Sequence, residues 1–419
     1  MRESKTLELK LQFSSSFLKT VSAFANCGTG SIIFGIDDNG QVIGIENIDA
    51  TCLQIENSIS DNIEPKPEYR IEIDNEAKTI SLIVDEGEDK PYFYKSKAYV
   101  RKDASTCEAD RLELMRLILA GKNQSFDSSQ ACNSDLSFAT LESYFQKQVG
   151  VLKLNRDILL TLRLINQAGK YTVAAELLAD HNMYPGIDMV KFGQDTNVFL
   201  DRNSYEHYSI LTQYESAIQK FRQYYIYEEI QGFQRYKHER IPESAFREAI
   251  ANALVHRTWD VDAPIKVAMF DNYLEITSPG GLPAGLSEDE FLHANISILR
   301  NPILADVLLK LRIIERFGTG IHRIFQTYEK SYIKPTFTIS SNIIQLRLPV
   351  LQINHPELTI DENSLLAAIA INGSSSSDLV NASHLGKTKV INMLNKLIKE
   401  GYVYKDGKGR STRYHRQKD

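Results

Sequence analysis

The sequence predicts a multidomain α+β protein. Its 419 residues are enough for two or three domains of ordinary size. Segments with the two-residue periodicity of half-buried strands alternate with segments of helical periodicity, which is typical of mixed folds. A polar stretch at 122–136 and a short break at 353–361 interrupt this pattern. They divide the chain into three predicted domains, which are residues 1–121, 137–350 and 363–419.

The composition excludes several classes of protein. Apolar residues make up 42% and charged residues 24%, which excludes wholesale disorder. No run approaches eighteen apolar residues and the N-terminus lacks an apolar segment, so we expect neither a membrane span nor secretion. The four cysteines lie far apart without a C-x-x-C pair, so neither a zinc site nor a disulfide framework is expected. These observations predict a cytoplasmic protein.

Charge is unevenly distributed along the chain. The whole sequence carries 48 Lys and Arg against 54 Asp and Glu, a net charge of −6. Residues 386–419 carry ten Lys and Arg against three acidic residues, a net of +7, so residues 1–385 carry −13. A basic tail on an acidic body predicts an element that binds a polyanion.

In the first predicted domain, strand patterns surround two helical patterns. The expected strands are 7–13, 30–37, 41–46, 68–73, 79–84 and 97–101, and the expected helices are 15–26 and 109–120. Asp37-Asp38-Asn39-Gly40 separates two apolar runs, which is strong hairpin chemistry.

The second predicted domain opens with helical patterns and then changes to strands. The expected helices are 157–167, 214–233 and 242–259, and the expected strands are 265–272, 273–279 and 342–350.

The last predicted domain has three helices and a basic hairpin, the arrangement of a winged helix-turn-helix. We expect the helices at 363–371, 376–383 and 387–401, and two short strands around 406–409. The third helix would enter a major groove and the hairpin would contact phosphates. The predicted DNA-binding residues are Lys387, Thr388, Lys389, Asn392, Lys396, Lys408, Arg410 and Arg413. The alternative is a winged helix that contacts only protein, with the lysines as a solvated face.

The middle domain contains four motifs that together resemble the family labelled as the C-terminal region of ATP-dependent helicases. They are N-A-L-x-H-R at 252–257, P-G-G-L at 279–282, R-N-P-x-L-A-D at 300–306 and E-R-x-G-T-G-I at 315–321. Glu248 and Asn252 lie four residues apart, on one face of the predicted helix. The resemblance extends to the nucleotide fold of gyrase-type and histidine-kinase-type ATPases, an α/β sandwich that binds ATP with Mg²⁺.

This resemblance implies a set of nucleotide-binding residues, which are Glu248, Asn252, Gly280, Gly281, Gly318 and Gly320. In the wider fold the asparagine holds Mg²⁺ and the glutamate positions water. Where that fold has an aspartate that reads adenine, this chain has Thr277 or Ser278. The alternative is a degenerate fold kept as a scaffold. The chain has no phosphate loop, because Asn381 stands at the first glycine position before Gly386-Lys387-Thr388, so we do not expect a helicase.

The N-terminal domain resembles the Schlafen/AlbA-2 family over about 115 residues. The matching motifs are E-S-x-x-x-E-x-K from residue 3, A-F-A-N-x-G from residue 23, G-x-D-D from residue 35, K-P-Y from residue 90 and Y-x-R from residue 99, with Thr29 as a departure where the family has glycine. In nucleolytic Schlafens three carboxylates bind a divalent metal that cleaves RNA. Matched to this sequence, they are Glu3, Glu8 and Asp38, which would bind Mg²⁺ or Mn²⁺.

Lys10 would then contact the scissile phosphate, since it shares a strand face with Glu8. Glu3 and Glu8 are five residues apart, so Glu3 has to lie on the segment before the strand and curl back. The alternative is that Glu8 and Lys10 form a plain surface pair. Many prokaryotic domains of this family are described only as nucleic-acid-binding modules of regulators.

Together, the three domains favour a cytoplasmic DNA-binding protein, a transcriptional regulator with nucleotide sensing. The first alternative is a metal-dependent nuclease that cleaves tRNA or other RNA in phage defence, and the second is an assembly scaffold. The sequence does not decide whether the chain is an enzyme. Eukaryotic Schlafens carry two copies of the N-terminal domain, whereas this chain carries one, so we predict a homodimer that restores the pair.

Overall fold

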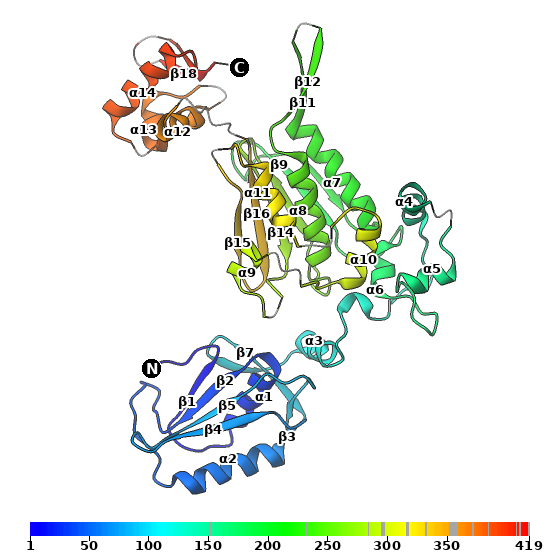
Figure 1. The fold of residues 1–419 in the computed structure, drawn as a ribbon, viewed down its shortest axis with the longest axis vertical. Helices are drawn as coiled ribbons and strands as arrows, with labels where there is room; N and C mark the ends of the chain where they lie inside the picture. The colour runs from blue at the N-terminus through cyan, green and yellow to red at the C-terminus, as the bar shows by residue number, and fades with distance from the viewer. Residues whose placement is uncertain are drawn as a thin grey trace. The chain divides into compact units, whose positions relative to one another are not determined.

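The computed structural model describes the chain except for residues 151–152, 232, 284, 295–297, 316–317, 332, 352–357, 371–372, 384, 408, 410–411 and 418–419. The described residues form two compact units, Met1–Gln130 and Ala131–Asp419, and Figure 1 shows their elements. None of the described helices is both long enough and apolar enough to cross a bilayer.

The N-terminal unit consists of two small sheets packed around one buried helix. One sheet has the order β1-β2-β5-β4, with β1 parallel to β2, and the other has the order β3-β6-β7-β8. The strands are β1 (Leu7–Lys10), β2 (Gly30–Phe34), β3 (Ile63–Glu64), β4 (Tyr69–Asp74), β5 (Thr79–Val84), β6 (Phe93–Tyr94), β7 (Lys97–Lys102) and β8 (Ser105–Glu108). The helices are α1 (Phe17–Cys27), α2 (Ile48–Asn62) and α3 (Arg111–Gly121), followed by the 3-10 turn Phe126–Ser128.

Helix α1 forms where the helical spacing of apolar residues predicts it. The four apolar residues of that pattern are buried: Phe17, Leu18, Val21 and Phe24. The helix contacts strands of both sheets, so its burial fixes the core of the unit. The predicted strands at 68–73, 79–84 and 97–101 correspond to β4, β5 and β7.

The predicted hairpin at 37–40 is only partly formed. Segment 41–46 makes a single bridge, between Ile36 and Val42, instead of a strand. The backbone N–H groups of Ile43 and Gly44 both donate to the carbonyl of Gly35, and this bends the chain away from a ladder.

Two further predictions for this unit were incorrect. The first strand ends at Lys10 instead of residue 13, because its partner β2 ends at Phe34, and Leu11 is 43% exposed. Helix α2 has no counterpart among the predicted elements. Its buried residues are Ile55 and Ile59, too few to give an apolar stripe.

The second unit contains a six-stranded mixed sheet of order β10-β9-β13-β14-β16-β15. Helices α7 and α8 pack against this sheet, and α11 packs against α8 (Figure 1). The strands are β9 (Ile187–Phe192), β10 (Phe199–Tyr205), β13 (Ile265–Met269), β14 (Tyr273–Pro279), β15 (Thr336–Ile339) and β16 (Ile343–Pro349). The helices are α4 (Ala139–Val149), α5 (Arg156–Thr161), α6 (Val173–Leu178), α7 (Ile210–Tyr225), α8 (Glu243–His256), α9 (Glu288–His293), α10 (Pro302–Lys310) and α11 (Gly320–Thr327).

Two of the predicted helices in this unit are too long. The one at 157–167 ends at Thr161, and the chain turns at Arg163, whose φ is +57°. The one at 214–233 ends at Tyr225, where β11 (Ile226–Gln231) begins and pairs with β12 (Gln234–Glu239) in a two-stranded ribbon. Ile226 and Tyr227 belong to the residue types that favour strands, so the apolar pattern continues while its period changes.

The last described elements are α12 (Ile360–Ala368), α13 (Ser376–Ser383) and α14 (Lys387–Lys399), followed by the ribbon β17 (Val403–Asp406) and β18 (Arg413–Arg416). They enclose a core of their own. The buried residues of α14 are Val390, Met393, Leu394 and Leu397, and Ile398 packs against them.

Candidate functional site

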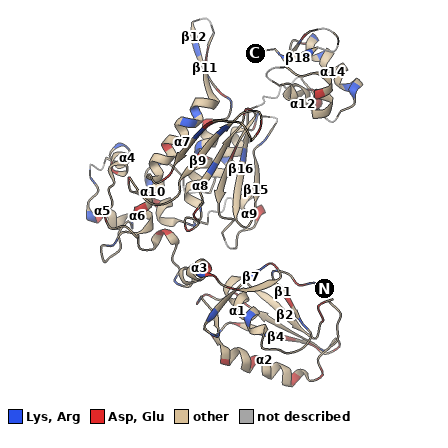
Figure 2. Ribbon diagram, turned by 180° about the vertical axis from the view of Figure 1, so that it is seen from behind, with Lys and Arg blue, Asp and Glu red and all other residues tan. Residues whose placement is uncertain are grey.

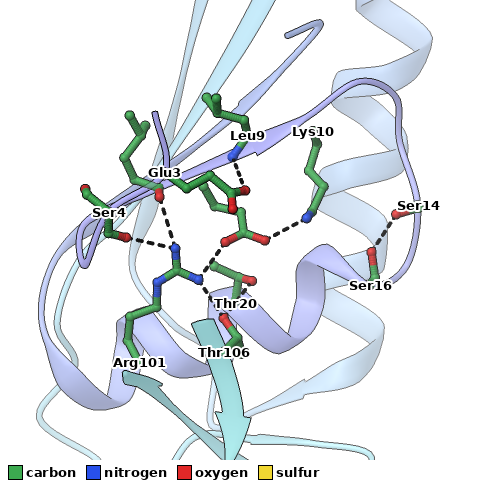
Figure 3. Close-up of polar contacts among 11 residues, drawn as sticks. Glu3, Ser4, Leu9, Lys10, Ser14, Ser16, Thr20, Arg101 and Thr106 are labelled. Atoms are coloured by element: carbon green, nitrogen blue, oxygen red, sulfur yellow. Dashed lines mark hydrogen bonds and ion pairs between the residues drawn. The ribbon is translucent and has the colours of Figure 1, made fainter. Parts of the chain in front are cut away.

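Glu8 lies in a buried network of charges in the N-terminal unit, and Figure 3 labels two of its partners, Lys10 and Arg101. The residue is 8% exposed. Its Oε2 accepts a hydrogen bond from Nη1 of Arg101 at 2.6 Å, and its Oε1 accepts one from Nζ of Lys10 at 2.6 Å. The Arg101 side chain is 1% exposed. Both carboxylate oxygens of Glu8 are therefore bound by cations.

Arg101 also fixes the segment that precedes β1. Its Nη2 donates to the backbone carbonyls of Ser4 at 2.9 Å and Leu7 at 3.0 Å, and Nη1 also donates to Oγ1 of Thr106 at 2.9 Å (Figure 3). The sequence prediction gave Arg101 no role, although the Y-x-R motif contains it. Its partner Glu8 is 93 residues away, so no local pattern connects the two.

Glu3 and Asp38 are in different environments. Glu3 lies before β1, as its spacing predicts, and its Oε1 accepts the backbone N–H of Leu9 at 3.1 Å. Asp38 is exposed and has no hydrogen bond or ion pair among the described residues. Its neighbour Asp37 organises the turn instead. The backbone N–H of Gln41 and further hydrogen bonds hold the pKa of the Asp37 carboxyl below its usual value.

The second unit contains a pocket of about 140 Å³. All six residues predicted to bind nucleotide line it: Glu248, Asn252, Gly280, Gly281, Gly318 and Gly320. They come from α8, from the turn after β14 and from the start of α11, so three distant segments converge. The rest of the described lining is mostly apolar and includes Ile276, Leu286, Phe291, Ile314, Ile321, Ile324, Phe337 and Leu346.

Glu248 and Asn252 lie on one face of α8, as their spacing predicts. Asn252 Nδ2 donates to Glu248 Oε1 at 3.4 Å, a long contact. Glu248 Oε2 accepts from Nη2 of Arg323 at 2.9 Å, and Nη1 of Arg323 forms an ion pair with Glu315 at 2.5 Å. The sequence prediction did not single out Arg323. No helix was predicted at 320–327, so the spacing of Arg323, three residues after Gly320, gave no usable signal.

Gly320 allows α11 to start directly against α8. A Cβ at this position would lie 2.2 Å from Glu248 Oε1 and 2.9 Å from Asn252 Nδ2. Only a glycine therefore fits here without displacing those two side chains.

Gly280 turns the chain after β14 with a φ of +105°, which other residues rarely adopt. The absent side chain leaves room for the hydrogen bond between Arg300 Nη1 and Thr258 Oγ1. Arg300 Nη2 also donates to the carbonyl of Gly281 at 2.9 Å. The first residue of the R-N-P motif thus holds the glycine turn in place.

Two other motif residues have structural roles. Arg257 is completely buried and donates to the carbonyls of Pro185 at 2.7 Å, Val261 at 3.2 Å and Ala263. Asn301 Nδ2 donates to the carbonyls of Val255 at 2.7 Å and Arg257 at 2.9 Å, which are orphan acceptors at the end of α8. These residues fix the end of the helix that carries Glu248 and Asn252.

His256 also lines the pocket and is neutral at physiological pH. Burial lowers the pKa of its imidazole to about 4, and the positive charge of Arg300 adds to this effect. The imidazole therefore adds no positive charge to the pocket.

The predicted DNA-binding residues of α14 differ in how they are paired. Lys396 Nζ contacts Glu362 Oε1 of α12 at 2.7 Å, and Lys389 forms an ion pair with Asp361 of the same helix. Figure 2 shows charged residues on these helices. Lys387, Thr388, Asn392 and Lys399 have no side-chain partner among the described residues.

The predicted phosphate contacts of the last ribbon are only partly described. Arg413 is exposed, and its Nη1 donates to the carbonyl of Gly373 at 3.3 Å. Lys408 and Arg410 lie outside the described residues.

Comparison with known families assigns two parts of the chain. Residues 3–110 match the family described as "Schlafen, AlbA_2", and residues 262–348 match the one described as "Putative ATP-dependent DNA helicase recG C-terminal". The chain combines a Schlafen/AlbA_2 domain with an ATPase-like domain. Both assignments agree with the sequence prediction and point to a function related to nucleic acids.

Two further comparisons add little. No curated protein matches the chain significantly. Among solved structures, the DIP2311 protein from Corynebacterium diphtheriae is similar at 18% identity, with a TM-score of 0.48, over 98% of this chain and 92% of the other. A likeness at this level carries no weight in the assignments.

The Schlafen/AlbA_2 domain does not fit a divalent cation in the arrangement described. Lys10 and Arg101 occupy both oxygens of Glu8, and Glu3 accepts a backbone N–H. Within the described part of the chain, no three His, Cys, Asp or Glu residues are grouped so that they could hold a metal. The metal site at Glu3, Glu8 and Asp38 therefore stays a prediction.

In the ATPase-like domain, the residues expected to hold the phosphates fit a nucleotide better than those expected to read its base. The amide oxygen of Asn252 has no hydrogen bond among the described residues, so it is available to a magnesium ion. At the expected base end, Ser278 donates to the carbonyl of Ala253 at 3.3 Å, and no carboxylate stands in its place.

Proposed function

We propose that the chain is a DNA-binding regulator whose ATPase-like domain senses a nucleotide. The observation that carries this proposal is the convergence of Glu248, Asn252 and two glycine turns on one pocket. These residues belong to separate segments, and glycine turns beside a helix start are well suited to phosphate, because backbone N–H groups can approach it. In this role Asn252 would hold Mg²⁺ and the bound ion would neutralise phosphate charge.

The DNA contacts, in this proposal, belong to residues 363–419, a winged helix-turn-helix. Support comes from three helices followed by a two-stranded ribbon, with α14 as the groove-reading helix. Lys387 and Lys399 present charges that no described acid neutralises. The net charge of +7 over residues 386–419 would attract a polyanion despite the acidic body.

The second candidate is a metal-dependent nuclease that acts on tRNA or other RNA. The carboxylate of Asp38 favours it, because this group is exposed and has no partner within the described part of the chain, so it is available to a metal. The occupied carboxylate of Glu8 disfavours it, because Arg101 and Lys10 would have to release it first.

We also propose that the protein is a homodimer. The ribbon β11–β12 pairs with no other described strand, and an isolated two-stranded ribbon is marginally stable in water. Ile230 is 67% exposed and Phe233 is fully exposed. Within the ribbon Arg235 pairs with Glu228 and His238 lies beside Glu229, so the exposed apolar residues are what the ribbon offers to a second copy of the chain.

The homodimer predicts a mass near twice 47.5 kDa by light scattering at tens of micromolar. A mass near 47.5 kDa would exclude it. Loss of the dimer in Phe233→Ser would assign the interface to the ribbon. We propose a cytoplasmic location, a reducing compartment in which four free thiols would be expected.

The proposed function is tested by incubating the purified chain with tRNA and with duplex DNA, in Mn²⁺ or in EDTA. Salt-sensitive binding of duplex DNA without cleavage supports the regulator. Cleavage of tRNA that requires Mn²⁺ and is lost in Asp38→Asn supports the nuclease. If the chain neither binds nor cleaves these nucleic acids, the assembly scaffold is the remaining candidate.

A further inference from the structure

Arg323 connects the two carboxylates at the phosphate end of the pocket. Among the described residues, it is the one that forms an ion pair with Glu248, at 2.9 Å, and it also pairs with Glu315, at 2.5 Å. The two pairs differ in exposure, because the Glu248 side chain is 15% exposed and the Glu315 side chain is 65% exposed. Solvent screens the Glu315 pair more strongly, so that pair is the easier one to exchange.

The guanidinium has hydrogen-bonding capacity to spare. It carries five N–H donors in a planar fork, and the carboxylates engage only its two terminal nitrogens. Its Nε is buried and has no hydrogen-bond partner among the described residues. One positive charge faces two carboxylates, so the guanidinium can release one of them and still keep an ion pair with the other.

Arg323 does not itself line the pocket, but its guanidinium contacts two carboxylates that do, Glu248 and Glu315. Gly320 begins α11 against Glu248 and Asn252, and Arg323 follows one turn later on the same face. A phosphate held near Asn252 would meet the start of α11 and the guanidinium together. Arginine binds phosphate with two parallel hydrogen bonds, a geometry that a lysine cannot provide.

We propose that Arg323 is the phosphate-recognising residue of the ATPase-like domain. Its guanidinium exchanges Glu315 for oxygens of the terminal phosphate and keeps its contact with Glu248. Arg323 thereby bridges the phosphate and Glu248 and positions the glutamate beside the nucleotide. This inference rests on the proposed nucleotide binding and adds to it the residue that distinguishes a triphosphate from shorter ligands.

The experiment compares the affinities of ATP, ADP and adenosine for the full chain by calorimetry with Mg²⁺ present. The variants are Arg323→Gln, Glu315→Gln and the control Arg202→Gln, which removes an exposed pair with Asp188 outside the pocket. Arg323→Gln is expected to weaken ATP binding about tenfold or more and to leave adenosine unchanged. Glu315→Gln removes the competing carboxylate and is expected to strengthen ATP binding about two- to fivefold.

The two variants thus have opposite effects, which a merely structural pair would not produce. Equal losses for ATP and adenosine in Arg323→Gln would overturn the inference, and so would unchanged ATP binding. If Arg323→Gln is misfolded by circular dichroism, Glu315→Gln decides alone, and its failure to strengthen ATP binding overturns the inference. Absence of ATP binding to the wild-type chain would overturn both this inference and the proposed function, whereas wild-type binding with no effect of either variant would overturn only the inference.

Discussion

Two glutamates predicted as functional, Glu8 and Glu248, are each bound by an arginine far away in the sequence. Arg101 is 93 residues from Glu8, and Arg323 is 75 residues from Glu248. The surroundings of the two pairs differ. The side chain of Arg101 is 1% exposed, and cations bind both oxygens of Glu8. The side chain of Arg323 is 31% exposed, and its partner Glu248 lines the pocket.

This difference separates a structural ion pair from a responsive one. Removing one partner of a buried pair leaves an uncompensated charge away from water, which is strongly destabilising. A half-exposed pair costs little to break, because solvent screens the charges. The pair at Glu8 is therefore suited to holding the fold together, whereas Arg323 is suited to exchanging its exposed partner, Glu315, while it keeps Glu248.

The largest expected effect is in the Schlafen/AlbA_2 domain. Arg101→Met leaves Glu8 buried without its main cation and should destabilise this domain by about 3–5 kcal/mol. Hydrogen exchange of α1 amides in the full chain measures the loss. The control Lys97→Met removes a pair in which Lys97 is 54% exposed, so it should hardly change the stability of the domain.

The double variant Arg101→Met with Glu8→Gln sharpens this prediction. It removes the charge that the single variant leaves unpaired, so much of the stability should return. Equal exchange rates in Arg101→Met and Lys97→Met would show that the Glu8 pair does not hold the fold.

The next effect is on nucleotide binding. Asn252→Ala removes the amide expected to hold Mg²⁺, so calorimetry with Mg²⁺ and ATP should detect no binding. Asn197→Ala, at an exposed position outside the pocket, should bind like the wild type. Since Ser278 stands where an acid would read adenine, we expect weak selectivity between ATP and GTP. Tight binding that is specific for adenine would place base recognition at another residue.

A third effect concerns the pH dependence of the ATPase-like domain. The pKa of His256 is about 4 in the folded chain against an ordinary value of 6.5. The unfolded chain therefore binds more protons between pH 4 and 6.5, and the domain should lose stability as the pH falls through this window. The thermal midpoint of His256→Asn should fall less than that of the wild type when the pH is lowered from 8 to 4. An equal fall in both proteins would show that His256 is not buried in its neutral form.

The smallest effects separate paired from unpaired lysines on α14. Lys387→Ala and Lys399→Ala should each weaken duplex binding about two- to fourfold. Each should also lower by about one the magnitude of the slope of log affinity against log salt concentration. Lys389→Ala and Lys396→Ala, whose charges face Asp361 and Glu362, should have less effect. Anisotropy titrations at several salt concentrations measure both quantities. Equal effects of all four would show that DNA displaces the two acids.

The sequence predicts local order better than distant contacts. The periodicity of Val390, Met393 and Leu394 predicts α14, because a helix repeats within a few residues. The spacing of Glu248 and Asn252 predicts their common face for the same reason. A change of period without a change of composition is harder to see, so the sequence prediction extends α7 beyond Tyr225 into β11.

The partners of the two glutamates could not be predicted. Arg101 reaches Glu8 only because β7 is brought beside the segment before β1, and that arrangement depends on the whole core. Glu8 is therefore buried, although the alternation of the first strand favours a surface position. The role of Arg323 likewise depends on α11 lying against α8.

The most direct test of the central claim is a titration of duplex DNA with the full chain and with residues 1–385, measured by anisotropy at moderate salt. Truncation removes a net charge of +7 together with α14, so affinity should fall at least tenfold. A full-length variant with Gln at Lys387, Lys399, Lys405 and Arg413 keeps the helices and should also bind more weakly. Unchanged affinity after truncation would contradict the assignment of DNA binding to the C-terminal domain.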